Sequence, residues 1–313
     1  MTGPPTGSPT GQPTAPGHVW VDGAILPADA LHLSVFDRGF QLGDGVFETL
    51  RARGGRTTEL PEHLARLHRS ADGLDIPLPD DADARLSAGI AALLAAEGLD
   101  GSDGDASIRI TVSRGPYRSR GVLPPDEAVA ATLVVQVWAV GGVPAGHLEQ
   151  GLHLVASRVR RDPQDPLAAL KTTSRAEYVY ARLEARRAGA DDALFLTIGD
   201  HLSEATSANL FLVRRAGDGS AELATPGLDC AILAGTTRAW LLGWATRVGL
   251  RPVEAQLMHA DLAGADEAFL CSSVAGVLPV TRFDGAPIGT GLPGPWTLRA
   301  RTDREAMIRG EAS

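Results

Sequence analysis

Lysine is almost absent from this chain: of the 29 lysine and arginine residues, 28 are arginine and only Lys171 is lysine. Arginine can form salt bridges and keep a surface soluble, but its guanidinium stays protonated and cannot attack a carbonyl. A buried lysine can lose its proton and form an imine with an aldehyde. Lys171 is therefore either a chance survivor of a coding bias or a residue kept for the chemistry of its amine.

Other absences exclude several classes of protein. Without a run of about 18 apolar residues, the sequence predicts no membrane-spanning helix and no membrane partner. The net charge of −9 and the lack of a basic stripe argue against nucleic acid as a partner. Two isolated cysteines, Cys230 and Cys271, indicate reduced thiols in a cytoplasmic protein. The spacings typical of metal sites, nucleophile elbows and phosphate-binding Walker loops are missing, so we expect no metal.

The composition that is present suits one large or two moderate domains, with 44% hydrophobic residues in 313. Residues 1–17 are rich in proline, glycine and threonine and lack the apolar segment of a signal peptide, which predicts a disordered tail. Glycine and proline at 141–144 interrupt the pattern and predict an interdomain linker at 141–147. We therefore expect two α+β domains, at 18–140 and 148–313.

Periodicity predicts the elements of each domain. For the first domain we expect a hairpin at 18–27, strands at 45–53, 56–60, 107–115 and 131–140, and helices at 61–74 and 82–97. For the second we expect strands at 153–161, 192–197, 209–213, 221–226, 268–273 and 277–283, and helices at 174–188 and 236–248. A turn at Gly199-Asp200 is predicted to pair strand 192–197 with strand 209–213.

Lys171 lies at the junction of a loop and a helix, where functional groups are common. A lysine that forms an imine with an aldehyde cofactor needs an acid facing the pyridine nitrogen. Glu204, between a turn and a strand, is the candidate for that acid, and its alternative role is that of a solvated turn residue.

Such a cofactor also needs a phosphate cradle. Thr236 and Thr237 begin a predicted helix, where free N–H groups favour an anion, although an ordinary threonine cap explains them equally well. Ser272 and Ser273 could add hydroxyls. Arg66 could add a counter-charge or be an exposed helical arginine.

These motifs occur in one order, which resembles the class IV pyridoxal-phosphate aminotransferases. The resemblance covers His18 to about Thr297 and is carried by FDRGFQLGDGVFETLR, EHLARLHRSADGLDI, LKTTSRAEYVYA, LSEATSANLF, ILAGTTR and ADEAFLCSS. It implies an α+β, two-domain fold type IV enzyme, with a smaller N-terminal sandwich-like domain and a larger, strand-rich C-terminal domain. It also implies pyridoxal 5′-phosphate in the cleft between them, and a homodimer with active sites at the subunit interface.

The resemblance also implies roles for individual residues. Lys171 matches the Schiff-base lysine, and Glu204 matches the partner of the pyridine nitrogen. The phosphate contacts match Arg66, Thr236, Thr237 and Ser273, with Ser272 beside them. Phe47 matches a pocket residue, or it is simply a buried aromatic of its strand.

The implied activity is transfer of an amino group between a small amino acid, of D configuration or branched, and a 2-oxo acid by a ping-pong mechanism. The alternative is an aminodeoxychorismate lyase that releases pyruvate and 4-aminobenzoate, and a non-catalytic binding protein of the same fold is a third hypothesis. Ala176 stands where branched-chain enzymes carry tyrosine, and the loop at 114–120 lacks the histidine of D-amino acid enzymes. That loop carries the candidates for binding the substrate carboxylate, Arg114, Arg118 and Arg120, unless it is a solvated hairpin loop.

Overall fold

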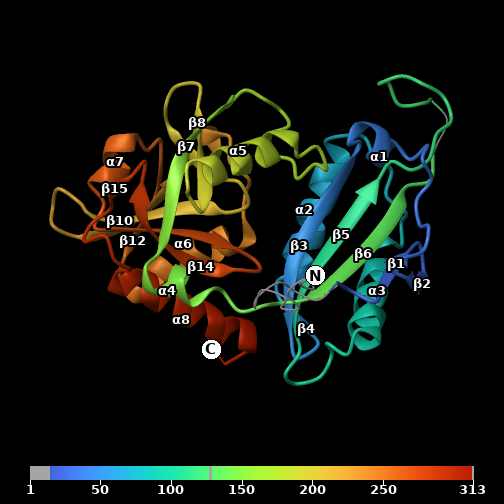
Figure 1. The fold of residues 1–313 in the computed structure, drawn as a ribbon, viewed down its shortest axis with the longest axis horizontal. Helices are drawn as coiled ribbons and strands as arrows, with labels where there is room; N and C mark the ends of the chain where they lie inside the picture. Colours follow the sequence, from blue (N-terminus) through green and yellow to red (C-terminus); the bar gives the residue numbers. More distant parts are fainter. Residues whose placement is uncertain (1–14, 127–128, 312–313) are drawn as a thin grey trace, which may run out of the picture.

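The computed structural model describes residues 15–126 and 129–311, and it contains two β-sheets (Figure 1). The first sheet is antiparallel throughout, in the order β2-β1-β6-β5-β3-β4. Its strands are β1 (His18–Val21), β2 (Ala24–Pro27), β3 (Gly45–Arg53), β4 (Arg56–Thr57), β5 (Asp105–Ser113) and β6 (Thr132–Ala139). Its helices are α1 (Arg38–Leu42), α2 (Leu60–Asp72) and α3 (Ala82–Ala96).

The second sheet has nine strands in the order β12-β11-β10-β13-β14-β7-β8-β9, with β15 beside β14. The strands are β7 (Leu152–Arg161), β8 (Asp192–Thr197), β9 (Leu202–Ala205), β10 (Asn209–Arg215), β11 (Ala221–Pro226), β12 (Arg251–Ala255), β13 (Glu267–Ser272), β14 (Gly276–Phe283) and β15 (Ala286–Pro287). The helices are α4 (Ala145–Glu149), α5 (Ala176–Arg187), α6 (Thr236–Val248), α7 (His259–Ala263) and α8 (Pro295–Arg309), with a 3₁₀ turn at Leu228–Cys230. The mixture of helix and strand confirms the α+β class.

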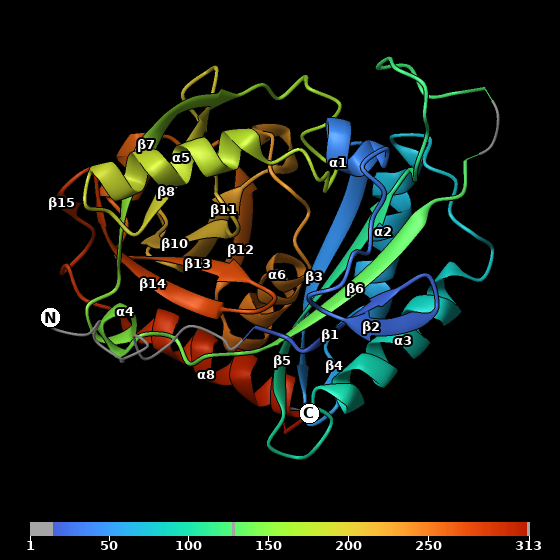
Figure 2. The same cartoon turned by 45° about the vertical axis from the view of Figure 1, so that its right-hand side comes forward.

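The side-chain alternation of β3 and β5 divides the first sheet into two faces. On one face, Leu50 and Ile108 are fully buried in a core cluster with Leu67 of α2 and Leu93 of α3. Figure 2 shows these two helices on one side of the sheet and the C-terminal half of the chain on the other. The residues that alternate with this core, such as Phe47, therefore face the C-terminal half.

Two expectations about strands are wrong. Strand β8 does not pair with β10: the turn at Gly199-Asp200 leads into β9, whose four residues are all buried, and β10 pairs with β11 and β13. Glu204 therefore lies in a strand, not between a turn and a strand. Strand 56–60 stops at Thr57, because Glu59 has a left-handed φ of 55° that cannot continue an extended strand and leads into α2.

The expected domain division remains a prediction. The first sheet ends at Ala139 and the second begins at Leu152, so the linker predicted at 141–147 overlaps the connection and contains the start of α4. Residues 1–14 of the predicted tail lie outside the described residues. The N–H of Gly17, at the end of that tail, donates to Glu97 Oε2 at 3.0 Å.

Candidate active site

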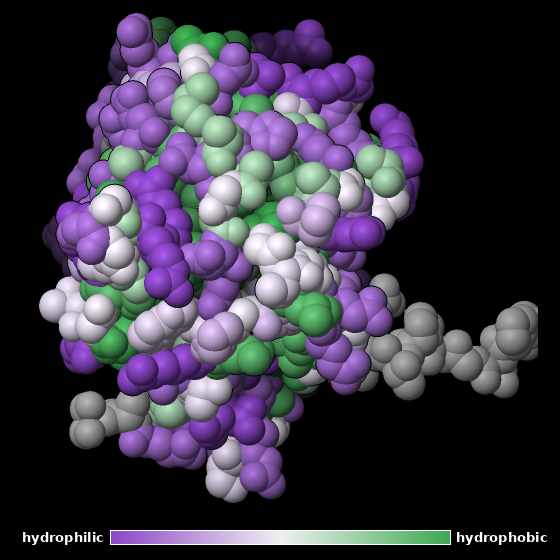
Figure 3. Space-filling view, turned by 90° about the vertical axis from the view of Figure 1, so that its left-hand side faces the viewer, coloured by the Kyte–Doolittle hydropathy of each residue, from purple (hydrophilic) through white to green (hydrophobic). Residues whose placement is uncertain are grey.

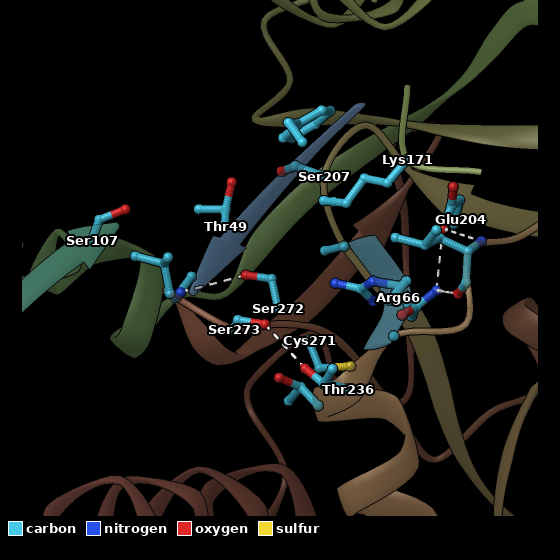
Figure 4. Close-up of a pocket in the computed structure, with 18 of the residues that line it drawn as sticks. Thr49, Arg66, Ser107, Lys171, Glu204, Ser207, Thr236, Cys271, Ser272 and Ser273 are labelled. Carbon is cyan, nitrogen blue, oxygen red and sulfur yellow. Dashed lines mark hydrogen bonds between the residues drawn. The ribbon is translucent and has the colours of Figure 1, made fainter. Parts of the chain in front are cut away.

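A cavity of about 500 Å³ lies between the two sheets and contains most of the predicted site residues (Figure 4). Strands β3 and β5 supply one wall, with Thr49 and Ser107 among its polar side chains. Helix α2 adds Arg66, and the C-terminal half supplies the rest, from the loop at Lys171, from β9, from the start of α6 and from the end of β13. The predicted site residues that line the cavity are Phe47, Arg66, Lys171, Glu204, Thr236, Thr237, Ser272 and Ser273.

Lys171 is held in place through its backbone. Its carbonyl accepts from the Phe47 N–H at 2.9 Å, and its own N–H donates to Ser70 Oγ at 3.1 Å. Its Nζ lies 4.7 Å from the centre of the Phe47 ring. Burial lowers the pKa of Lys171 to about 8, although the nearby Glu48 carboxylate favours the charged form. About a tenth of this amine is therefore unprotonated at pH 7, and the fraction rises steeply towards pH 8, which suits a nucleophile or base.

Glu204 lines the same cavity from β9. Its Oε2 accepts from Asn209 Nδ2 at 3.1 Å and from the Leu233 N–H at 3.0 Å. Burial raises the pKa of Glu204, while the Leu233 N–H and the positive charge of Arg161 oppose that rise. A carboxylate in this setting favours a positively charged or proton-bearing partner in the cavity.

The start of α6 offers free N–H groups to the cavity. The cap residue, Gly235, has no side chain to satisfy them, and no other side chain caps this end among the described residues. A Cβ at Gly235 would lie 2.1 Å from Asn209 Oδ1, so the close approach requires glycine. The hydroxyls of Thr236 and Ser273 lie 3.2 Å apart at this end of the cavity. The arrangement suits an anion such as a phosphate.

Arg66 reaches this end of the cavity but is already paired. Its Nε and Nη2 donate to the two carboxylate oxygens of Glu48, both at 2.7 Å, and its Nη1 donates to the Ala234 carbonyl at 2.8 Å. The Glu48 side chain is completely buried. Burial alone would raise the pKa of Glu48, but hydrogen bonds from Arg66 and His63 outweigh it and lower the pKa to about 2.

Helix α8, which was not predicted from the sequence, contacts the start of α6 at the phosphate end of the cavity. Its Arg304 is fully buried, pairs with both oxygens of Glu59 at 2.8 Å, and donates to Thr237 Oγ1 at 3.2 Å. The sequence did carry capping signals for this helix, because Gly294 and Pro295 stand at its start and Gly310 at its end.

The three arginines predicted to bind the substrate carboxylate do not line the cavity of their own chain. For Arg114 the prediction is wrong: its guanidinium is buried and is taken up by the Asp44 carboxylate and by the carbonyls of Leu74 and Asp75. Arg118 and Arg120 are exposed in the following loop, with Arg118 over the ring of Phe36 at 5.7 Å. Their role remains a prediction that depends on a second subunit.

Two other arginines, missed in the sequence analysis, do line the cavity. Arg109 on β5 lies over the Phe47 ring, with its guanidinium carbon 3.9 Å from the ring centre. Arg175 lies 3.1 Å from the ring centre of Tyr178 and donates to the Thr206 carbonyl at 3.0 Å. Among the described residues, neither guanidinium has a carboxylate within 4.0 Å. Burial and the neighbouring charge of Arg175 lower the pKa of Arg109.

Within residues 15–126 and 129–311, no group of three histidine, cysteine, aspartate or glutamate side chains is arranged to hold a metal ion. No helix in the same part of the chain is long and apolar enough to cross a membrane.

The donor groups fit a pyridoxal phosphate. The amine of Lys171 can react with an aldehyde, Glu204 can face a ring nitrogen, and the start of α6 can receive a phosphate. These features define the class of the site as that of a pyridoxal-phosphate enzyme.

Comparisons with known proteins identify the family. A family model for amino-transferase class IV matches residues 45–283. The D-alanine aminotransferase of Bacillus licheniformis is 29% identical over 94% of this chain and 98% of its own length. The aminodeoxychorismate lyase of Vibrio harveyi is 32% identical over 84% of this chain and 90% of its own length. The crystal structure of the Escherichia coli branched-chain amino acid aminotransferase has a TM-score of 0.83 at 26% identity, over 96% of this chain and 97% of its own.

The chain belongs to the class IV aminotransferases. Family membership confirms three expectations from the sequence. They are the fold type IV architecture, the pyridoxal phosphate cofactor, and action on amino acid and 2-oxo acid substrates.

Proposed function

We propose that this enzyme transfers an amino group between an amino acid and a 2-oxo acid, with Lys171 moving the proton and with Arg109 and Arg175 binding substrate carboxylates. The observation that supports this proposal is the position of Lys171, the only lysine in the sequence. Its amine has a pKa lowered to about 8 and lies in the cavity together with Glu204 and the uncapped start of α6.

Each residue has a part in this reaction. Pyridoxal phosphate, when bound, supplies an electron-poor ring that delocalises the electron pair left at the substrate Cα. Lys171 takes the proton from Cα as a general base and returns it as a general acid. Glu204 would keep the ring nitrogen protonated, while Thr236, Thr237 and Ser273 would hold the phosphate. Because the same lysine serves both half-reactions, we predict ping-pong kinetics: double-reciprocal plots are parallel, and intersecting plots would contradict the proposal.

Arg109 and Arg175 replace Arg114 as the proposed carboxylate contacts. Both guanidiniums are in the cavity and free of carboxylates among the described residues. Arg109 Nε donates to Thr111 Oγ1 and Arg175 Nη2 donates to the Thr206 carbonyl, which leaves the other N–H groups of each for a substrate carboxylate. The wall beside them is polar, with Thr49, Ser107 and Ser207. This setting favours a polar or acidic side chain over a branched aliphatic one.

The second candidate is the aminodeoxychorismate lyase activity. It is favoured by two guanidiniums that have no carboxylate partner among the described residues, because its products, pyruvate and 4-aminobenzoate, each carry one of the two carboxylates of the substrate. The two activities differ in their need for an acceptor. A transaminase forms product only when a 2-oxo acid is added, whereas the lyase releases pyruvate from aminodeoxychorismate alone. Pyruvate release without an acceptor would therefore replace the first proposal with the second.

We further propose a homodimer. Large apolar side chains are exposed in the segment before β3 and in the loop after β5, namely Leu31, Val35, Phe40, Val122 and Leu123. In contrast, hydrophilic and hydrophobic residues are interspersed over the face of the C-terminal half (Figure 3). A second copy covering the exposed apolar side chains would place Arg118 and Arg120 at a subunit interface. Analytical ultracentrifugation of the wild type and of Phe40→Glu tests the homodimer, because a monomeric wild type would contradict the proposal.

The cytoplasmic location also stays a prediction.

A further inference from the structure

A fully buried histidine, His63, connects the phosphate end of the cavity to Glu48. Its Nδ1 lies 2.7 Å from Glu48 Oε2. On the other side of the ring, Nε2 lies 3.3 Å from Thr236 Oγ1 and 3.3 Å from Ser273 Oγ. These two hydroxyls are themselves 3.2 Å apart, so Nε2 and the two oxygens form a closed triangle. None of the functions assigned above uses this imidazole.

The position of one imidazole proton follows from Glu48. Hydrogen bonds from Arg66 and His63 outweigh the effect of burial and lower the pKa of Glu48 to about 2, so its side chain is a carboxylate. A carboxylate only accepts hydrogen bonds, and therefore Nδ1 carries a proton and donates it to Oε2. If the ring is neutral, Nε2 has a bare lone pair and can only accept.

Counting protons in the triangle shows what a neutral ring does to the cradle. Thr236 and Ser273 have one O–H proton each. The Thr236 hydroxyl also hydrogen-bonds to the Glu59 carboxylate. With a neutral ring, Thr236 donates to Glu59 and Ser273 donates to Nε2, so neither proton is left for an anion. With a protonated ring, Nε2–H donates to the hydroxyl oxygens, and the Ser273 proton can point into the cavity. Phosphate oxygens only accept, so the protonated ring suits them.

The charges around the triangle point the same way. Glu48 faces His63 from β3, and Arg66, on the same helix as His63, approaches Nδ1 at 3.4 Å. Glu59 also interacts electrostatically with His63 and is paired with Arg304 of α8, while Lys171 faces Glu48. The two carboxylates and two guanidiniums cancel, so these pairs leave no net positive charge for a phosphate dianion. A proton on His63 would supply one.

We propose that His63 is a positioning residue of the phosphate cradle, and that it takes up one proton from solvent when a phosphate dianion binds. The protonated imidazole then donates to the hydroxyl oxygens and frees the Ser273 hydroxyl proton for the anion.

Calorimetric titration with pyridoxamine 5′-phosphate tests this, because that ligand carries the phosphate but cannot react with Lys171. Proton uptake is obtained from titrations at pH 8 in buffers of different ionisation enthalpy. We expect the wild type to take up about one proton more than His63→Gln. Between pH 7.5 and 8.5, the affinity of the wild type should fall about tenfold more than that of the variant. Pyridoxamine without phosphate is the matched ligand, for which the two proteins should show the same pH dependence.

Equal proton uptake in the two proteins, or a difference that persists with pyridoxamine, would overturn the proposal. If His63→Gln does not fold, ¹⁵N NMR of the wild-type histidines decides. In the complex at pH 8 we expect a buried imidazole with both nitrogens protonated. A neutral ring in the complex, protonated only at Nδ1, rules the proposal out.

Discussion

Replacing Arg109 with glutamine should change activity and stability in opposite directions. The guanidinium of Arg109 is half-buried, lies over the Phe47 ring at 3.9 Å, and has no carboxylate partner among the described residues. Its pKa is lowered by burial and by the charge of Arg175. In the free enzyme its charge is therefore a cost to folding, which a substrate carboxylate can offset.

The magnitudes follow from the type of interaction. A hydrogen bond between charged groups contributes about 1.5–3 kcal/mol, so Arg109→Gln should lower kcat/KM for a substrate that uses this contact by about 10- to 150-fold. Removing the charge also removes its repulsion with Arg175. We expect the free energy of unfolding of the substrate-free enzyme to rise by about 0.5–2 kcal/mol.

The assay compares kcat/KM for dicarboxylic and monocarboxylic amino donors, together with urea unfolding followed by circular dichroism. Arg282→Gln is a matched control, since Arg282 is exposed on β14 and lies outside the cavity. The control should leave both quantities nearly unchanged. If Arg109→Gln keeps its kcat/KM for every donor, or becomes less stable than the wild type, Arg109 is a structural residue and the proposed carboxylate site is wrong.

Three further predictions concern Lys171 and Glu48. Lys171→Arg keeps the positive charge but should lower kcat by at least about 100-fold and abolish borohydride trapping of the cofactor on the protein; a labelled peptide from this variant would contradict the role of Lys171. Because the pKa of Lys171 is about 8, covalent capture of pyridoxal phosphate by the apoenzyme should accelerate as pH rises through 8, and a stopped-flow rate that is independent of pH between 6.5 and 9 speaks against a free amine. Glu48→Gln should lower the free energy of unfolding at pH 7 by about 3 kcal/mol, because the pKa of Glu48 is about 2 in the folded protein instead of the usual 4.5. This stabilisation is complete above pH 4.5 and decreases progressively as the pH falls towards 2. Glu62→Gln, on the exposed side of α2, is the control for urea unfolding, and an equal loss in the two variants would show that the buried pair adds nothing.

Local sequence supplied the candidates for the centre of the site, and the family resemblance chose among their alternative roles. The single lysine, Glu204 and the Gly-Thr-Thr start of a helix line the same cavity. The strand that holds Glu204 was missed because LSEA is short and half polar, so its alternation resembles a turn. Its burial comes from neighbouring strands far along the chain.

The substrate contacts could not be read from local pattern. In β5 the residues Ser107, Arg109 and Thr111 alternate with buried Ile108 and Ile110, which is the pattern of a strand with one face in water. That face meets the cavity only because the C-terminal half of the chain lies in front of it. In contrast, the loop with Arg118 and Arg120 was selected because it contains several arginines. Clustered arginines in a sequence do not reveal which of them already have carboxylate partners in the fold.

The arginines of this region differ in how their charges are balanced, and the difference separates two kinds of ligand. Near α6, Arg66 is paired with Glu48, and Arg304 is paired with Glu59 through its two Nη atoms. Near β5, Arg109 and Arg175 have no such partners among the described residues. Paired arginines are rigid and cost little to the stability of the protein, so they suit a cofactor phosphate that stays in place through both half-reactions. Unpaired arginines destabilise the empty site, and each arriving carboxylate relieves that cost. They therefore suit a substrate that must enter and leave twice in every catalytic cycle.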